Sequence, residues 1–332
     1  MTDLDDVAFH NVAETREVLG YEGVRLQRVP EDVRRALNED AAERMLVPTA
    51  SEVRFVPESP SVSVALSAPS GSVRVQPFWG PYQGEPFTVG HDAESFELAV
   101  PEKVREGRAR GGRGFAPRVC RLICRGASGM RGDWLLYHGV EGETRPPEPD
   151  EVPDTRYLAY GTSITEDGSA SEIHLTYASL TARRLGADLL NLGCSGSAHC
   201  EAAIADHIAA RDDWDVATLS VSVNMLGFDI EEFRERAAYL VDTVAAADPD
   251  RPVVAVTLFE NEYEGDRSGR FREALVEAVE AADRPNLSVL SGPSISEASG
   301  LSADAVHPGD AGHATIAEGL APKLRRRLAE SS

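Results

Sequence analysis

A regular alternation of short apolar runs and helical patterns over residues 155–332 constrains the fold more than any other feature of the sequence. The apolar runs predict five strands, at 156–160, 188–192, 215–223, 252–259 and 287–290. Helical patterns follow them, at about 173–185, 201–211, 231–247, 267–283 and 311–328. Strands that alternate with helices form a parallel sheet covered on both faces, since the crossovers are right-handed. The sequence therefore predicts a five-stranded, parallel, doubly wound α/β domain of flavodoxin-like form over residues 155–332.

Upstream of this domain, the apolar residues alternate with a period of two. Six short runs show the pattern, at 52–56, 61–66, 72–78, 95–100, 118–124 and 133–137, and turn residues rich in glycine and proline separate them. No helical pattern lies between these runs. We expect residues 47–141 to form an antiparallel β-sandwich of jelly-roll type.

Two further segments complete the predicted organisation. Residues 1–46 are predicted as an N-terminal helical segment, because Pro30 stands where a helix begins and acidic residues fill the first turn after it. Residues 142–154 contain four prolines and five acidic residues, which predicts an extended, stiff and solvated linker.

The excess of acidic over basic residues disfavours negatively charged binding partners. With 55 acidic and 33 basic residues the net charge is −22, so we expect repulsion from nucleic acid and from anionic membranes. Lysine occurs only at Lys103 and Lys323. This composition resembles that of proteins from salt-loving organisms, where molar salt shortens the Debye length to about 3 Å. The alternative is an acidic protein from a GC-rich genome, which also favours arginine.

Other classes of protein are disfavoured by what the sequence lacks. No run approaches the roughly 20 apolar residues of a membrane span, and the N-terminus has no signal-peptide pattern, so a soluble cytoplasmic protein is expected. The cysteines Cys120, Cys124, Cys194 and Cys200 show no CxxC spacing and are predicted to be reduced thiols in or near cores, with a zinc site as the alternative. No metal or nucleotide motif is present, and we expect no cofactor.

Polar residues with catalytic potential follow the predicted strands. Ser163 comes two residues after the first strand, Gly196 follows the second, and Asn224 follows the third. Asp304 and His307 stand just before the last helix. The carboxyl ends of parallel strands lie at one edge of the sheet, so these groups are expected to meet. The order Ser, Asp, His is that of α/β hydrolases.

These blocks resemble those of the SGNH hydrolase superfamily, also called GDSL-type esterases and lipases. The matching residues are Gly161-Thr-Ser163-Ile-Thr165, Asn191-Leu-Gly-Cys-Ser-Gly196, Asn224 and Asp304-Ala-Val-His307-Pro308. The preceding β-domain resembles the subgroup with a jelly-roll domain and a Ser-Ile-Thr block. The sequence departs from the family pattern at Thr162, where the family's namesake Asp stands, and at Met225.

The resemblance implies roles for these residues. Ser163 would be the nucleophile, His307 the base, and Asp304 the group that orients the imidazole. The oxyanion hole would consist of the Ser163 N–H, the Gly196 N–H and the Asn224 amide, with Gly193 as the alternative glycine.

Three more residues are candidates for lining the pocket: Thr162, His199 and Glu201. The acidic pair Glu166-Asp167, next to the nucleophile block, would either disfavour anionic substrates or belong to the acidic surface.

The sequence thus predicts a serine esterase that cleaves a carboxylic ester through an acyl-enzyme. By analogy with the jelly-roll subgroup, the substrate would be a small-molecule ester with a short acyl group on a small alcohol or sugar, such as an acylated carbohydrate. One alternative is an acyltransferase with the same acyl-enzyme. Another is a non-catalytic glycan-binding protein. The sequence gives no oligomeric state.

Overall fold

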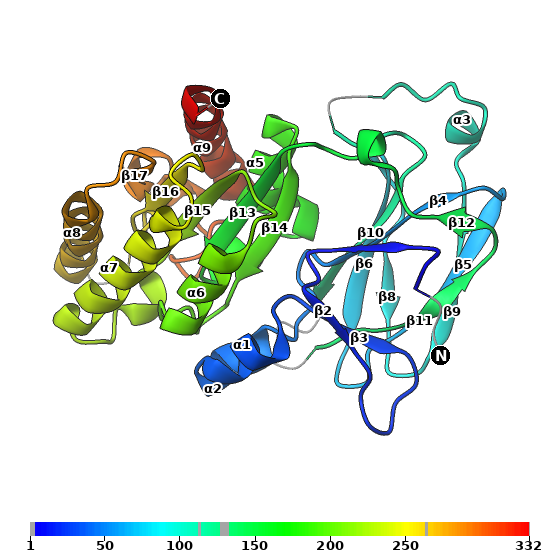
Figure 1. Ribbon diagram of the computed structural model, residues 1–332, viewed down its shortest axis with the longest axis horizontal. Helices are drawn as coiled ribbons and strands as arrows, with labels where there is room; N and C mark the ends of the chain where they lie inside the picture. Colours follow the sequence, from blue (N-terminus) through cyan, green and yellow to red (C-terminus); the bar gives the residue numbers. More distant parts are fainter. Residues whose placement is uncertain (1–3, 112–113, 127–132, 263–264, 332) are drawn as a thin grey trace. The chain divides into compact units, whose positions relative to one another are not determined.

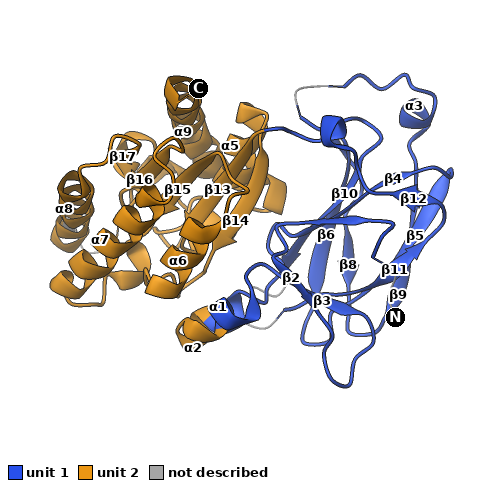
Figure 2. Ribbon diagram, viewed as in Figure 1, with its two compact units in different colours: residues 1–34, 42–154 blue, residues 35–41, 155–332 orange. Residues whose placement is uncertain are grey.

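A computed structural model describes residues 4–111, 114–126, 133–262 and 265–331 of the chain (Figure 1). Contacts divide the chain into two compact units (Figure 2). Unit 1 comprises residues 1–34 and 42–154, and unit 2 comprises residues 35–41 and 155–332.

Unit 1 contains two antiparallel sheets. The first has the order β1 (Ala8–His10), β4 (Glu52–Pro57), β10 (Cys120–Gly126), β6 (Val73–Trp79) and β7 (Tyr82–Gln83), with β12 (Thr144–Arg145) beside β4 and β8 (Phe87–Val89) beside β6. The second has the order β2 (Glu14–Arg16), β3 (Val24–Gln27), β11 (Leu136–Glu141), β5 (Ser61–Ser67) and β9 (Glu94–Ala99). A short helix, α3 (Glu102–Arg105), follows β9.

Both sheets contribute to one hydrophobic core. Alternate residues of β5 (Val62, Val64, Leu66) are buried in it, together with Val53 and Phe55 of β4. This alternation is the period of two seen in the sequence, and it places one face of each sheet against the core. The prediction of antiparallel sheets in this region is confirmed, and the jelly-roll topology stays a prediction.

The N-terminal region differs from the predicted helical segment over residues 1–46. The strands β1, β2 and β3 lie in it and join the two sheets. Strands of three or four residues are too short to show a clear period, which explains the error. The predicted helix consists of two shorter ones, α1 (Glu31–Ala36) and α2 (Glu39–Arg44). The break comes at Asn38, whose side-chain oxygen caps α2 by accepting the Ala41 N–H at 3.0 Å.

The proline-rich stretch over residues 142–154 also has more structure than an extended linker. Its strand β12 pairs with β4, and a 3-10 turn, η1, spans Pro149–Glu151. Arg145 makes an ion pair with Glu151 at 2.7 Å. This pairing across the prolines cannot be read from composition.

Unit 2 contains a five-stranded parallel sheet with the order β14, β13, β15, β16, β17. The strands are β13 (Arg156–Gly161), β14 (Asp188–Gly193), β15 (Val216–Ser220), β16 (Val253–Val256) and β17 (Leu287–Leu290). The connecting helices are α4 (Ser163–Glu166), α5 (Tyr177–Leu185), α6 (Ala202–Ala210), α7 (Ile230–Ala246), α8 (Gly265–Ala282) and α9 (Asp310–Ser331). Short 3-10 helices lie at Ile173–Leu175 (η2), Val223–Met225 (η3), Gly292–Ser294 (η4) and Ala298–Gly300 (η5).

The helices of unit 2 cover the sheet on both faces. Helix α5 packs against α9, and α7 packs between α6 and α8 (Figure 1). The five-stranded parallel sheet predicted for residues 155–332 is confirmed. The predicted strands 215–223 and 252–259 end earlier, at Ser220 and Val256, because the chain leaves the sheet there to form loops at its carboxyl edge.

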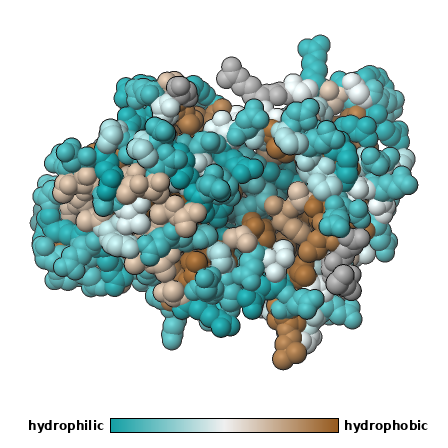
Figure 3. All heavy atoms as spheres, in the orientation of Figure 1, coloured by the Kyte–Doolittle hydropathy of each residue, from teal (hydrophilic) through white to brown (hydrophobic). Residues whose placement is uncertain are grey.

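The described residues contain no helix long and apolar enough to cross a membrane. The face drawn in Figure 3 is largely hydrophilic, as expected for a chain in which charged residues make up 27% of the sequence.

Candidate active site

The predicted nucleophile stands at a sharp turn between strand β13 and helix α4. The strand ends at Gly161 and the helix begins at Ser163, with Thr162 as its extended N-cap residue. The turn requires a glycine at position 161, since a Cβ there would lie 2.6 Å from the Ser220 carbonyl oxygen. Ser163 keeps 8% of its surface exposed. The turn therefore places a hydroxyl at the carboxyl edge of the sheet.

A continuous hydrogen-bonded chain joins the three predicted catalytic side chains. The Ser163 Oγ lies 2.7 Å from His307 Nε2, and His307 Nδ1 lies 2.6 Å from Asp304 Oδ2. The serine and the histidine are 144 residues apart in the sequence. A serine nucleophile needs a base beside its hydroxyl and a group that orients this base, and the hydrogen bonds are compatible with such an arrangement.

Asp304 is held as an anion by hydrogen bonds. Burial raises the pKa of the Asp304 carboxyl, but N–H groups of His307 and Val306, the His307 imidazole and the Ser302 hydroxyl donate to it and lower the pKa well below its usual value. Between the aspartate and the histidine, Ala305 has a φ of 59°, a left-handed conformation that costs a non-glycine residue free energy. The tight turn thus fixes the carboxylate against the imidazole.

The three predicted oxyanion donors differ from the alternative glycine in their hydrogen bonding. Among the residues that the structure describes, the N–H groups of Ser163 and Gly196 and the side-chain amide nitrogen of Asn224 have no hydrogen-bond partner. The alternative glycine differs, because the Gly193 N–H donates to Asn191 Oδ1 at 2.8 Å. The geometry therefore favours Gly196 over Gly193.

The amide of Asn224 has a fixed orientation. Its Oδ1 accepts the Ala198 N–H at 3.2 Å, which leaves its NH2 group as the free end. Two residues earlier Ser222 has a φ of 107°, far outside the usual range of a serine. This bend carries the chain from β15 into the η3 turn that holds Asn224.

The other candidates for the pocket have different surroundings. The His199 ring lies 4.7 Å from the Phe228 ring, and burial lowers the pKa of this imidazole. Glu201 is the N-cap residue of α6, and its carboxylate accepts a hydrogen bond from the Asn38 amide. Of the three, only Thr162 lines the pocket described next.

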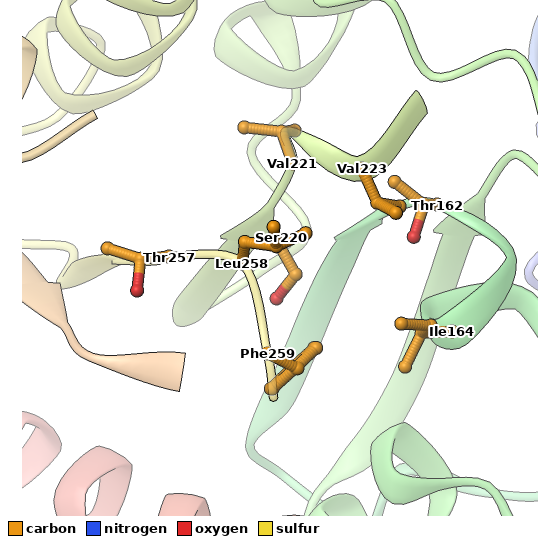
Figure 4. A pocket seen from close by; sticks show the side chains of 8 residues that line it. All are labelled: Thr162, Ile164, Ser220, Val221, Val223, Thr257, Leu258 and Phe259. Carbon is orange, nitrogen blue, oxygen red and sulfur yellow. The ribbon is translucent and has the colours of Figure 1, made fainter. Parts of the chain in front are cut away.

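A small, largely apolar pocket lies next to the nucleophile turn (Figure 4). Its interior has space for about one water molecule. Its lining comes from the turn itself and from the loops after β15 and β16: Thr162, Ile164, Ser220, Val221, Val223, Thr257, Leu258 and Phe259. The sequence did not indicate most of these residues, because positions 221–223 and 257–259 continue apolar runs that predict strands.

Glu166 has a role that neither of its predicted interpretations covers. Its side chain is fully buried and accepts the Ser195 N–H at 2.7 Å. A Cβ at Gly193 would collide with the Glu166 backbone, so the glycine allows this close approach. The carboxylate therefore holds the loop that carries Gly196.

The four cysteines are buried and free, as predicted. In the described part of the chain, no three His, Cys, Asp or Glu side chains are grouped so that they could hold a metal ion.

Comparisons with known proteins agree with the fold of both units. No curated protein matches the sequence closely enough to count as a relative. Among solved structures, a protein described as a GDSL-like lipase from Bacteroides ovatus superposes with a TM-score of 0.72 at 17% identity, over 98% of this chain and 96% of the other. A salicylyl-acyltransferase from a tetracycline biosynthetic pathway gives 0.71 at 17% identity, over 98% and 94%. A family two carbohydrate esterase from Cellvibrio japonicus gives 0.68 at 13% identity, over 98% and 96%.

The family comparison concerns unit 2. The model of the GDSL-like lipase/acylhydrolase family matches residues 155–325, which is more than half of the chain and includes every strand of the parallel sheet. The chain therefore belongs to the GDSL-like lipase/acylhydrolase family.

Proposed function

We propose that this protein is a serine esterase that cleaves a carboxylic ester through an acyl-enzyme on Ser163. The observation that carries the proposal is the unbroken chain of hydrogen bonds from Ser163 Oγ through His307 to Asp304. Membership of an acylhydrolase family supports it.

In the first half of the reaction, His307 Nε2 takes the hydroxyl proton while Ser163 Oγ forms a bond to the ester carbonyl carbon. The carbonyl oxygen becomes an anion, and the free N–H groups of Ser163, Gly196 and Asn224 stabilise it. Each such donor lowers the barrier by about 3–4 kcal/mol. His307 then gives its proton to the leaving alcohol as the C–O bond breaks.

In the second half, a water molecule takes the place of the alcohol. His307 removes a proton from the water as its oxygen attacks the acyl carbon, and then returns the proton to Ser163 Oγ as the acid leaves. Asp304 stays ionised throughout and stabilises the imidazolium.

The acyl group is short, and the alcohol is small or a sugar. The small pocket beside Thr162 and Ile164, which has no room for a long acyl chain, supports a short acyl group. The similarity of the fold to carbohydrate esterases supports a sugar.

An acyltransferase is the second candidate, and one observation favours it. The fold of the salicylyl-acyltransferase matches nearly the whole chain. The acyl-enzyme would be the same, with an alcohol in place of water. Adding alcohols and sugars to an ester assay, and analysing the products by mass spectrometry, distinguishes the two: an esterase releases free acid, whereas a transferase forms a new ester.

The test of the proposed function is hydrolysis of p-nitrophenyl acetate by the wild-type protein and by Ser163→Ala. We expect the substitution to lower kcat/KM by about 10⁴-fold or more, because no other nucleophile replaces the hydroxyl. Ser294→Ala, at an exposed serine, serves as the matched control and keeps full activity. Equal turnover by the wild type and Ser163→Ala would refute the proposal and favour a glycan-binding protein.

A further inference from the structure

Unit 2 includes a segment from far upstream in the sequence. Residues 35–41 precede the strand β4 of unit 1, yet their contacts assign them to unit 2 with residues 155–332. The centre of this segment is Asn38, which is partly buried.

The Asn38 side chain makes two kinds of hydrogen bond. Its oxygen accepts the Ala41 N–H and caps helix α2. Its NH2 group donates to the Ser197 carbonyl oxygen at 3.0 Å and to the Glu201 carboxylate, and it lies 3.3 Å from His199 Nδ1. The amide therefore binds the loop between β14 and α6 through residues about 160 positions away in the sequence.

This loop carries the free Gly196 N–H, and other contacts already hold it on both sides of the glycine. Before the glycine, the Ser195 N–H is bound by the buried carboxylate of Glu166 at 2.7 Å. After it, the Ala198 N–H is bound by Asn224 Oδ1 at 3.2 Å. Gly196 itself has a φ of 70°, and its N–H has no hydrogen-bond partner among the described residues.

The Ser197 carbonyl, directly after the glycine, is bound by Asn38. Ser197 is buried, and its carbonyl oxygen would lack a hydrogen bond from the described residues without the Asn38 amide. A buried carbonyl that loses its donor tends to rotate its peptide towards another one. The peptide that follows Ser197 carries the Ala198 N–H, so such a rotation would also release Asn224 Oδ1.

We propose that Asn38 is a positioning residue of the oxyanion hole. By binding the Ser197 carbonyl and the Glu201 carboxylate, it keeps the Gly196 N–H and the Asn224 amide oriented towards the place of the substrate carbonyl oxygen. This inference rests on the proposed function, and it adds a residue of the N-terminal segment to the machinery of that reaction. Displacing a donor by about 1 Å costs up to about 100-fold in rate. Loss of the Asn38 hydrogen bonds should therefore lower kcat/KM measurably.

Mutation can separate the two functions of the Asn38 side chain, which are the capping of α2 and the hydrogen bonds to the loop between β14 and α6. Serine caps helices about as well as asparagine but has no NH2 group. Asn38→Ser therefore keeps the cap of α2 and loses the hydrogen bonds to Ser197 and Glu201. Asn38→Asp also keeps the cap and places a carboxylate against Glu201 and the Ser197 carbonyl. Glu39→Ser, at the exposed neighbouring residue, is the matched control.

The experiment compares ester hydrolysis with binding of a boronic acid, which forms a tetrahedral adduct on Ser163 that resembles the transition state. We expect Asn38→Ser to lower kcat/KM and raise the boronate Ki by the same factor, about tenfold, with KM within about twofold of the wild type. Asn38→Asp is expected to show a larger change of both quantities, and Glu39→Ser none. Active sites are titrated with a fluorophosphonate so that rates are given per folded, reactive serine.

Three outcomes would overturn the inference. The first is an Asn38→Ser variant with wild-type kcat/KM and boronate Ki. The second is a loss of activity that disappears when rates are expressed per titrated serine, because this would show a purely structural role. The third is a wild-type protein that neither hydrolyses the ester nor binds the boronate, and this outcome would refute the proposed function itself. In the first two outcomes the proposed function stands.

Discussion

Three non-glycine residues close to the candidate site have positive φ angles. They are Cys200, Ser222 and Ala305, with φ values of 53°, 107° and 59°. Each stands within four residues of Gly196, Asn224 or His307. Conformations of this kind cost about 1–3 kcal/mol each and persist only where the surroundings enforce them. Their position next to the proposed catalytic groups indicates that these strained residues lower the free energy of unfolding and, in return, fix the geometry of the candidate site.

Ser222→Gly tests this at the residue with the largest deviation. Glycine adopts a φ of 107° without strain, and the substitution removes a buried hydroxyl that has no hydrogen-bond partner in the described structure. We expect the free energy of unfolding to rise by about 1 kcal/mol, measured by urea denaturation. Ser294→Gly, at an exposed serine with an ordinary φ, should lower it slightly. A loss of stability in Ser222→Gly would contradict the interpretation.

Asp304→Asn tests how the imidazole is oriented. Asparagine still accepts the two backbone N–H groups, but its NH2 group cannot accept the His307 Nδ1 proton, so the imidazole takes the wrong tautomer. We expect kcat to fall by about 10⁴-fold with little change in fold. The lowered pKa of Asp304 means that its stabilising effect is complete above its ordinary pKa and is lost only as the pH falls through the lower folded value. Stability curves of wild type and variant should therefore converge only in strong acid.

On the scale of elements, arginines from two neighbouring helices bind carbonyl groups at the carboxyl edge of the parallel sheet. Arg236 of α7 donates to the His199 carbonyl, and Arg272 of α8 donates to the Leu258 and Phe259 carbonyls at 2.9 Å. A guanidinium has five donors in a rigid fork and can bind two carbonyls at once, which an ammonium does less well. The use of arginine in place of lysine therefore favours the hydrogen bonds that hold these loops.

In unit 1, strands β4 and β10 share a buried ionic cluster. Glu52 accepts from Arg54 and Arg121, and the Arg121 guanidinium lies 3.6 Å from the centre of the Phe115 ring. Burial alone would raise the pKa of Glu52, but the two guanidinium groups outweigh it and lower the pKa far below its usual value. The carboxylate is therefore ionised in the folded protein.

Glu52→Gln should destabilise unit 1 by about 3–5 kcal/mol at neutral pH, since it leaves the buried Arg54 and the half-buried Arg121 without their counter-charge. The folded pKa is lowered, so the contribution of Glu52 is complete above its ordinary pKa of 4.5 and declines as the pH falls towards the folded value. Denaturant titrations from pH 7 to pH 3 should show a constant difference down to about pH 4.5 that then shrinks. Glu97→Gln, on the exposed side of β9, should show no difference. A Glu52→Gln variant as stable as the wild type would contradict this account.

The sequence predicted the elements of unit 2 better than those of unit 1. Strands such as 156–160 and 188–192 are apolar throughout because both faces of a parallel sheet are covered, and helices of 9 to 22 residues show several periods. In unit 1 the strands β1 to β3 have only three or four residues, and pairing with distant partners decides their structure. The candidate triad followed from order and strand ends. Asn38 and Glu166 could not be predicted in the same way, because their roles depend on contacts over 163 and 29 positions.

For the whole molecule, the net charge of −22 is the dominant property. Carboxylates far outnumber their arginine partners, so most of them repel one another in dilute buffer. We expect the thermal unfolding temperature to rise steeply from dilute buffer to several molar KCl, which screens this repulsion to about 3 Å. Differential scanning calorimetry at matched pH measures it. Equal unfolding temperatures in dilute buffer and in molar KCl would show that the acidic composition is not an adaptation to salt.

The division of unit 2 into residues 35–41 and 155–332 has a consequence for synthesis on the ribosome. The segment with Asn38 emerges first, and residues 42–154 must follow before the first strand of its own unit appears. At about 5–20 residues per second this delay lasts roughly 6–23 s. During that time α2 has no loop to bind. A recombinant fragment that begins at Thr155 would contain the whole parallel sheet and the proposed triad of Ser163, Asp304 and His307. It would lack the Asn38 amide that binds the loop of Gly196.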